Sequence, residues 1–204
     1  WNVIAAYGAA KRGYVEGYEA SDAGAYDLLV DLLSNVAVFD PGARESVITF
    51  ANGIGDVLLT YENEYYAGIA AGDEYDIVYP RSTVLIENPV AVVDTYADAH
   101  GVREAADAFV EFLYTPEAQA IFISKGYRPP VYLSEEATAE STPEAEATEV
   151  PTTALWPEGA FDTAVFPLID DIFTVQYFGG WSKIGEDFFS ETGIYSQAIA
   201  ETQE

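Results

Sequence analysis

The sequence predicts an α/β fold, because segments with helical spacing of apolar residues alternate with short apolar runs of strand length. The clearest case lies between residues 40 and 66, where turn, helix, glycine-flanked turn, strand and second helix start follow one another. A chain of 204 residues with 50% hydrophobic content can bury one sizeable core or two small ones. These observations together favour a globular α/β protein.

The first part of the chain predicts two helices and one short strand. Apolar residues on one face predict a helix from Asn2 to Tyr18. Ser21 is a suitable N-cap for a second helix, whose apolar face ends at Leu33. The apolar run from Val36 to Phe39 then predicts a buried strand.

The turn that follows is the first candidate for a binding site. Pro41 stops the strand, Gly42 permits close approach of a ligand, and Ala43 opens a helix with an unobstructed backbone N–H. Helix N-termini carry unpaired N–H groups and can hold an anion. An ordinary strand-to-helix turn is the competing interpretation, and spacing alone favours it.

A buried strand is predicted next, from Asp56 to Tyr61, and a helix from Glu62. In open α/β sheets ligands bind beyond the carboxyl ends of strands, so the Tyr61 hydroxyl is a candidate donor. As a bare pattern, an aromatic residue at a strand end is more often part of the core.

Further elements are expected downstream. The patterns predict a strand at Tyr75–Tyr79, an extended segment at 84–94 and an amphipathic helix at Val102–Tyr114 that packs through its apolar face. Thr115 and Pro116 predict the cap and first turn of another helix that Gly126 ends.

Residues 134–153 are rich in Glu, Ala, Thr, Ser and Pro and predict a flexible acidic insertion. Trp181 is expected to be a packing anchor.

Charge and composition exclude several functions. The net charge of -27, from 35 acidic and 8 basic residues, argues against nucleic acid and anionic membrane surfaces as partners. The chain has no cysteine, which excludes disulfides, zinc–thiolate sites and thiol catalysis. No run has the apolar length that spans a bilayer.

Catalysis has little support in the sequence. His100 is the one histidine and lies in a predicted loop, where a solvated side chain is the default. Glu62 and Glu64 resemble an acid/base pair, but residues two apart at a helix start point in different directions. We therefore expect no enzyme, no cofactor and no metal site.

Several motifs resemble the periplasmic proteins that deliver sulfate or thiosulfate to ABC importers. The resemblance touches most of the chain outside 134–155, in the order and spacing of its motifs. The matching runs are Trp1-Asn2, Phe39-Asp40-Pro41-Gly42-Ala43-Arg44, Gly53-Ile54-Gly55-Asp56-Val57-Leu58, Glu62-Asn63-Glu64 and Gly179-Gly180-Trp181-Ser182-Lys183.

The resemblance implies a type II periplasmic-binding-protein fold with two lobes, of which this chain is the C-terminal portion. The N-terminal parts of both lobes would be missing. Residues 1–85 would belong to the second lobe, and residues 86–204 to the C-terminal part of the first lobe. The implied ligand contacts are Gly42, Ala43, Arg44 and Tyr61. Among these Arg44 is expected to hold loop carbonyls rather than touch the anion, and Tyr61 stands where many relatives have Trp.

The resemblance further implies a monomeric extracytoplasmic solute-binding protein. Its ligand would be sulfate, thiosulfate or a related oxyanion, and its partner a membrane permease. It would be periplasmic or extracellular and held at the membrane by the permease or a lipid anchor. Two alternatives stay open: a ferric-iron-binding protein that uses Tyr65 and Tyr66, and a non-catalytic acidic interaction module.

Overall fold

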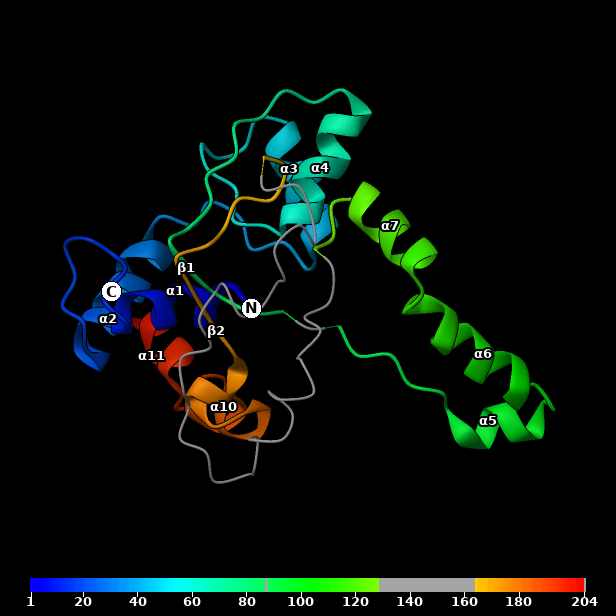
Figure 1. Ribbon diagram of the computed structural model, residues 1–204. Helices are drawn as coiled ribbons and strands as arrows, with labels where there is room; N and C mark the ends of the chain where they lie inside the picture. The colour runs from blue at the N-terminus through cyan, green and yellow to red at the C-terminus, as the bar shows by residue number, and fades with distance from the viewer. Residues whose placement is uncertain (87, 129–163, 204) are drawn as a thin grey trace.

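A computed structural model describes residues 1–86, 88–128 and 164–203, and helices predominate in them (Figure 1). One small parallel sheet joins distant parts of the chain, with Ser82, Thr83 and Val84 opposite Asp171, Ile172 and Phe173. The predicted α/β class is thus confirmed in part, as a mostly helical structure with a two-stranded parallel sheet. The described elements are α1 (Asn2–Lys11), α2 (Asp22–Ser34), α3 (Ala43–Ala51), α4 (Glu62–Ala71), β1 (Ser82–Val84), α5 (Asp94–Ala99), α6 (Arg103–Leu113), α7 (Pro116–Ser124), β2 (Asp171–Phe173), the 3₁₀ turn η1 (Val175–Phe178), α10 (Trp181–Asp187) and α11 (Ile194–Glu201).

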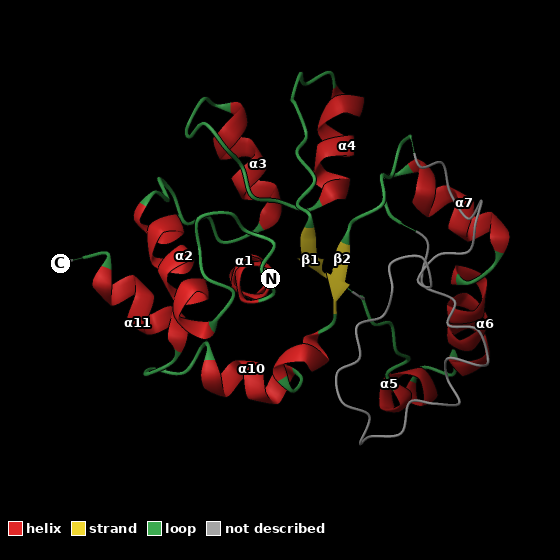
Figure 2. Cartoon of the chain, turned by 60° about the vertical axis from the view of Figure 1, so that its left-hand side comes forward, coloured by secondary structure: helices red, strands yellow, loops and turns green. Residues whose placement is uncertain are grey.

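The main core lies where α1, α2, α10 and α11 meet the sheet. Ile4, Leu29 and Ile184 are almost completely buried there and come from three different helices. Figure 2 shows β1 and β2 side by side between this group of helices and the α5–α7 segment. The core therefore depends on contacts between the beginning and the end of the described chain.

Most helix starts agree with the predictions, but α5 lies where an extended run and a loop were expected. Ser21 caps α2, because its Oγ accepts a hydrogen bond of 3.2 Å from Gly24 N. Thr115 caps α7 in the same way through Ala118 N at 3.3 Å. The first helix ends earlier than expected, at Lys11, since Gly13 adopts a left-handed φ of 81°.

Three predicted strands are wrong. Residues 36–39, 56–61 and 75–79 form no regular element, and Val57 and Val78 are 79% and 88% exposed. A strand needs a neighbour to accept and donate its backbone hydrogen bonds. Within the described residues the β1–β2 pair is the only ladder, so these apolar runs have no partner there.

The predicted packing of the helix at 102–114 is also wrong. α5, α6 and α7 extend away from α1 and α2 (Figure 1), and α6 has no buried residue although its apolar residues follow helical spacing. Phe109 is 60% exposed. The spacing identified the helix correctly but not what its apolar face contacts.

Two other predictions have different outcomes. Trp181 packs edge-to-face on Trp1, with 4.7 Å between ring centroids, but it is 52% exposed, so the contact is present while the anchoring role stays a prediction. The predicted insertion at 134–153 lies outside the described residues. Across the described ranges, the helices are too short or too polar to cross a membrane.

Candidate functional site

The N-termini of α3 and α4 form the centre of the candidate site. α3 begins at Ala43 directly after Gly42, and α4 begins at Glu62 directly after Tyr61. Neither N-terminus has a side-chain cap. In the part of the chain that the structure describes, the N–H groups of the first two residues of each helix make no hydrogen bond, and the helix dipoles favour a negative acceptor there.

The α3 start is held in place by local hydrogen bonds. The Gly42 carbonyl accepts from both the backbone N and the Oγ of Ser46, each at 3.1 Å. Thr49 Oγ1 donates to Asp40 Oδ1 at 2.8 Å, which ties the preceding turn to the helix. Ala43 stands first in the helix and carries only a methyl side chain, while the Glu45 carboxylate of the same turn lies beside Gly42.

Arg44 connects the two helices. Its Nη2 donates a hydrogen bond to Glu64 Oε1 at 3.3 Å. The same nitrogen lies 3.1 Å from Glu64 Oε2, which is an ion-pair distance, but that contact lacks hydrogen-bond geometry. The Glu64 side chain is nearly buried, whereas the Arg44 side chain is 58% exposed. Arg44 thus holds a carboxylate of α4, rather than the loop carbonyls that we expected it to hold.

Tyr61 is the N-cap residue of α4, and the chain just before it contacts α1. The side-chain amide of Asn2, the first residue of α1, donates to the carbonyl of Leu59 at 3.2 Å. Next to it, Thr60 Oγ1 is buried and has no hydrogen-bond partner in the described chain. Tyr61 itself is half-buried, and its carbonyl accepts from Glu64 N at 3.0 Å. Two predicted donors, Ala43 and Tyr61, therefore stand beside helix starts that Arg44 and Glu64 link.

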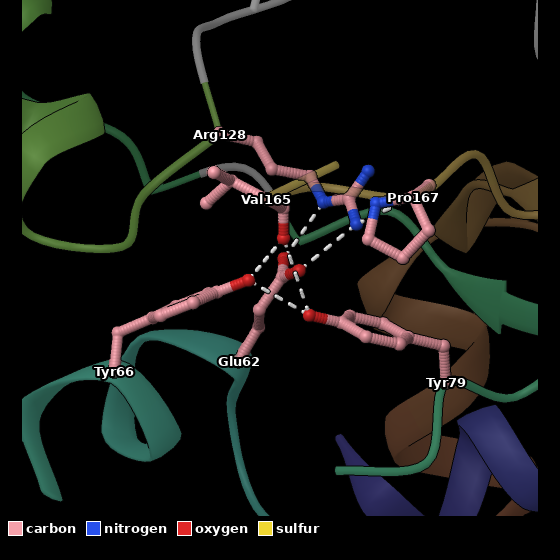
Figure 3. Close-up of polar contacts among 6 residues, drawn as sticks. All are labelled: Glu62, Tyr66, Tyr79, Arg128, Val165 and Pro167. Atoms are coloured by element: carbon pink, nitrogen blue, oxygen red, sulfur yellow. Dashed lines mark hydrogen bonds and ion pairs between the residues drawn. The ribbon is translucent and has the colours of Figure 1, made fainter. Parts of the chain in front are cut away.

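A second ion pair supports the start of α4 (Figure 3). The Arg128 guanidinium makes two hydrogen bonds to the Glu62 carboxylate, with Nε to Oε2 at 2.7 Å and Nη2 to Oε1 at 2.9 Å. Arg128 Nη2 also donates to the Pro167 carbonyl at 3.0 Å. Both side chains are largely buried, with 15% of Arg128 and 22% of Glu62 exposed.

Two tyrosines complete this cluster. The hydroxyls of Tyr66 and Tyr79 lie 2.8 Å apart, and the Tyr66 hydroxyl donates to the Val165 carbonyl. Burial, the bond to Tyr66 and the negative charge of Glu62 all raise the pKa of Tyr79. Tyr79 therefore stays a neutral phenol at neutral pH.

The side chains considered for catalysis are not assembled into a reactive group. His100 is exposed and follows the last residue of α5. Glu62 and Glu64 point in different directions, as their spacing predicted, and each pairs with a different arginine, Arg128 and Arg44. Within the described ranges no three His, Asp or Glu side chains gather in a way that would hold a metal. What the arrangement offers is donor groups for an anion.

Comparison with known proteins shows the family to which the chain belongs. The family model described as "Bacterial extracellular solute-binding protein" matches residues 3–128, more than half of the chain. The chain belongs to this family of binding proteins, which are not enzymes, so the expectation of a non-catalytic protein is confirmed.

Individual members of the family that bind sulfate or thiosulfate are similar to this chain. The chain is 37% identical over 98% of its length to the sulfate-binding protein of Synechococcus elongatus, and 35% identical over 97% to that of Escherichia coli. The thiosulfate-binding protein of Escherichia coli is 36% identical over 63% of the chain. These matches confirm the resemblance seen in the motifs. The chain spans about half the length of the curated relatives it matches, 50% and 52% for the two sulfate-binding proteins.

The sequence did not reveal the Glu62–Arg128 pair. The two residues are 66 positions apart, and Arg128 lay in a run assigned to packing. Two signals were present, an acidic residue at a helix start and one of only 8 basic residues in the chain. Their pairing needs the fold.

Proposed function

We propose that this chain takes part in binding sulfate or thiosulfate in a two-lobed solute-binding protein of the type II kind. The observation that carries the proposal is the 37% identity to a sulfate-binding protein over 98% of the chain. The uncapped starts of α3 and α4 support it, because a site of this kind suits a dianion.

Ala43 and Tyr61 are the proposed donors. Ala43 would donate its backbone N–H and Tyr61 its hydroxyl, while Gly42 gives the ligand room beside the chain. Arg44 would act through its contact with Glu64 and hold α3 against α4. A buried dianion needs hydrogen bonds to nearly all of its oxygens, since burial of an unsatisfied charge is very costly.

Selectivity follows from the protons of the ligand. Sulfate at neutral pH only accepts hydrogen bonds, whereas phosphate still carries a proton that needs an acceptor. A site lined by donors leaves that proton unpaired and so disfavours phosphate. The proposed ligand class is therefore fully ionised oxyanions.

The proposal includes the cellular setting. Residues 1–85 and 86–204 would contribute to different lobes that close on the ligand, and the closed monomer would then dock to an ABC permease. The family is extracellular or periplasmic. We also propose that the protein is held at the membrane by the permease or by a lipid anchor.

A thermal melt at fixed ionic strength tests this function. Sulfate, thiosulfate, molybdate, phosphate and chloride are compared at equal concentration, with sulfate and thiosulfate expected to raise Tm selectively. A ligand at a hundred times its Kd stabilises by about 2.7 kcal/mol, which a melt resolves easily. A cooperative melt that no oxyanion shifts would overturn the proposal. Visible colour on adding ferric iron would instead support the tyrosinate alternative.

A further inference from the structure

Glu62 places a negative charge at the start of a helix that is proposed to hold an anion. It is the first residue of α4 and follows Tyr61 directly. The N-terminal N–H groups of a helix attract carboxylates of its own first turn as well as ligands. An unpaired Glu62 carboxylate would therefore compete with a bound oxyanion or repel it.

The structure shows what prevents this. Arg128 holds both carboxylate oxygens of Glu62 at 2.7 and 2.9 Å and is itself fixed by the Pro167 carbonyl at 3.0 Å. Figure 3 shows the Glu62 side chain pointing toward Arg128, with the Tyr66 and Tyr79 hydroxyls beside the carboxylate. Two-point pairing fixes the direction of a carboxylate as well as neutralising it.

The position of Arg128 in the chain makes the contact informative. It lies beyond α7, whose preceding helices extend away from the α1–α2 core (Figure 1). Two neighbouring residues contact the Arg128 guanidinium. Pro167 accepts a hydrogen bond from it through its carbonyl, and the Phe166 ring centroid lies 5.5 Å from it. Arg128 thus joins the segment around residue 166 to the carboxylate at the start of α4.

We propose that Arg128 is a positioning residue for the oxyanion site, which keeps the Glu62 carboxylate neutralised and turned away from the N-terminus of α4. This inference rests on the proposed function and adds a specificity role for a residue that does not touch the ligand. Without Arg128, the Glu62 carboxylate would be free to compete with the oxyanion for the N-terminus of α4. The loss of sulfate affinity on removal of Arg128 should therefore depend on the presence of the Glu62 carboxylate.

A double-mutant cycle tests the dependence. Sulfate Kd is measured by calorimetry for the wild type, Arg128→Ala, Glu62→Gln and the double variant. Arg128→Ala should weaken binding roughly tenfold, the effect of one competing charge at a helix terminus. Glu62→Gln alone should bind nearly as the wild type does, and the double variant should recover most of the lost affinity.

Controls separate this role from simple destabilisation. Arg103→Ala removes the same charge from an exposed pair with Asp94 and Asp98 on α5 and should leave Kd unchanged. Ligand-free melts of all variants report stability directly. If Arg128→Ala does not fold, Arg128→Lys keeps the charge without the two-point pairing, and should show a smaller loss that Glu62→Gln again relieves.

Each outcome is decisive. A double variant as weak as Arg128→Ala, or an Arg128→Ala variant with the wild-type Kd, would overturn the positioning role and leave sulfate binding intact. A wild-type protein that binds no oxyanion would overturn the proposed function, and this inference with it.

Discussion

Arg12 and Asp171 form a buried two-point ion pair although 159 residues separate them, with Nε to Oδ2 at 2.8 Å and Nη2 to Oδ1 at 2.6 Å. Ser82 Oγ donates to the same carboxylate. Since Ser82 begins β1 and Asp171 begins β2 opposite it, the Ser82–Asp171 hydrogen bond helps to hold the register of the sheet.

Arg12→Ala should destabilise the protein by about 3–5 kcal/mol, because it leaves the Asp171 carboxylate buried without its counter-charge. Denaturant unfolding measures the change. Arg103→Ala, which breaks an exposed pair, should cost less than about 1 kcal/mol. Equal effects of the two substitutions would show that the buried pair has no special weight in stability.

The stability that Asp171 contributes should be lost in acid. Burial alone would raise the pKa of this carboxyl, but the hydrogen bonds from Arg12 and Ser82 outweigh burial and lower it below the ordinary value of 3.8. A lowered folded-state pKa means that the contribution is present above pH 3.8 and declines as pH falls through the folded-state value.

The comparison with Asp171→Asn isolates this group from the other carboxylates, which both proteins share. The difference in unfolding free energy between wild type and variant should be constant near neutral pH and shrink below about pH 4. A difference that does not change with pH would contradict the lowered pKa.

Two glycine substitutions should have opposite signs. A Cβ at Gly8 in α1 would lie 2.2 Å from the tip of the Phe173 ring, which is buried in the core. Gly8→Ala should therefore cost about 1–3 kcal/mol through overpacking, despite the better helix propensity of alanine.

Gly185 in α10 is the matched control, because a Cβ there meets nothing within 4 Å. Gly185→Ala should stabilise the protein by about 0.4–1 kcal/mol. Thermal or denaturant unfolding of both variants checks the pair. Stabilisation by Gly8→Ala would mean that Phe173 moves easily and that the core is loosely packed there.

The proposed Ala43 donor has a selective test in Ala43→Pro. Proline removes the backbone N–H, is well accepted at the first position of a helix, and suits the extended Gly42 before it, at φ -158° and ψ 165°. Sulfate affinity should fall by about 1.5–3 kcal/mol while stability is kept. Ala43→Ser, which retains the N–H, should bind normally. Normal binding by the proline variant would remove Ala43 from the site.

The Tyr61 hydroxyl is tested by Tyr61→Phe. Loss of one hydrogen bond to a charged ligand should weaken sulfate binding by about 1–3 kcal/mol. Tyr96→Phe, on an exposed tyrosine of α5, is the control and should have no effect. Calorimetric titration measures both. An unchanged Kd in Tyr61→Phe would leave Tyr61 as a packing residue only.

Helix boundaries were predictable because they depend on neighbours in the sequence. Ser21 and Thr115 cap their helices through residues three positions on, and Gly126 follows α7 with a φ of 84°. The starts of α3 and α4, and with them the candidate residues Ala43 and Tyr61, follow from the same local chemistry. The motifs around them also indicated the family correctly.

Strands and long-range charge pairs were not predictable. An apolar run becomes a strand only when another strand lies beside it, and residues 56–61 and 75–79 lack such a neighbour among the described residues. Arg128 meets Glu62, and Arg12 meets Asp171, across 66 and 159 residues. Residues close together along the chain set where α2, α3, α4 and α7 begin. Which arginine neutralises which carboxylate follows from the fold, because charge pairing depends on distance in space and not on separation along the chain.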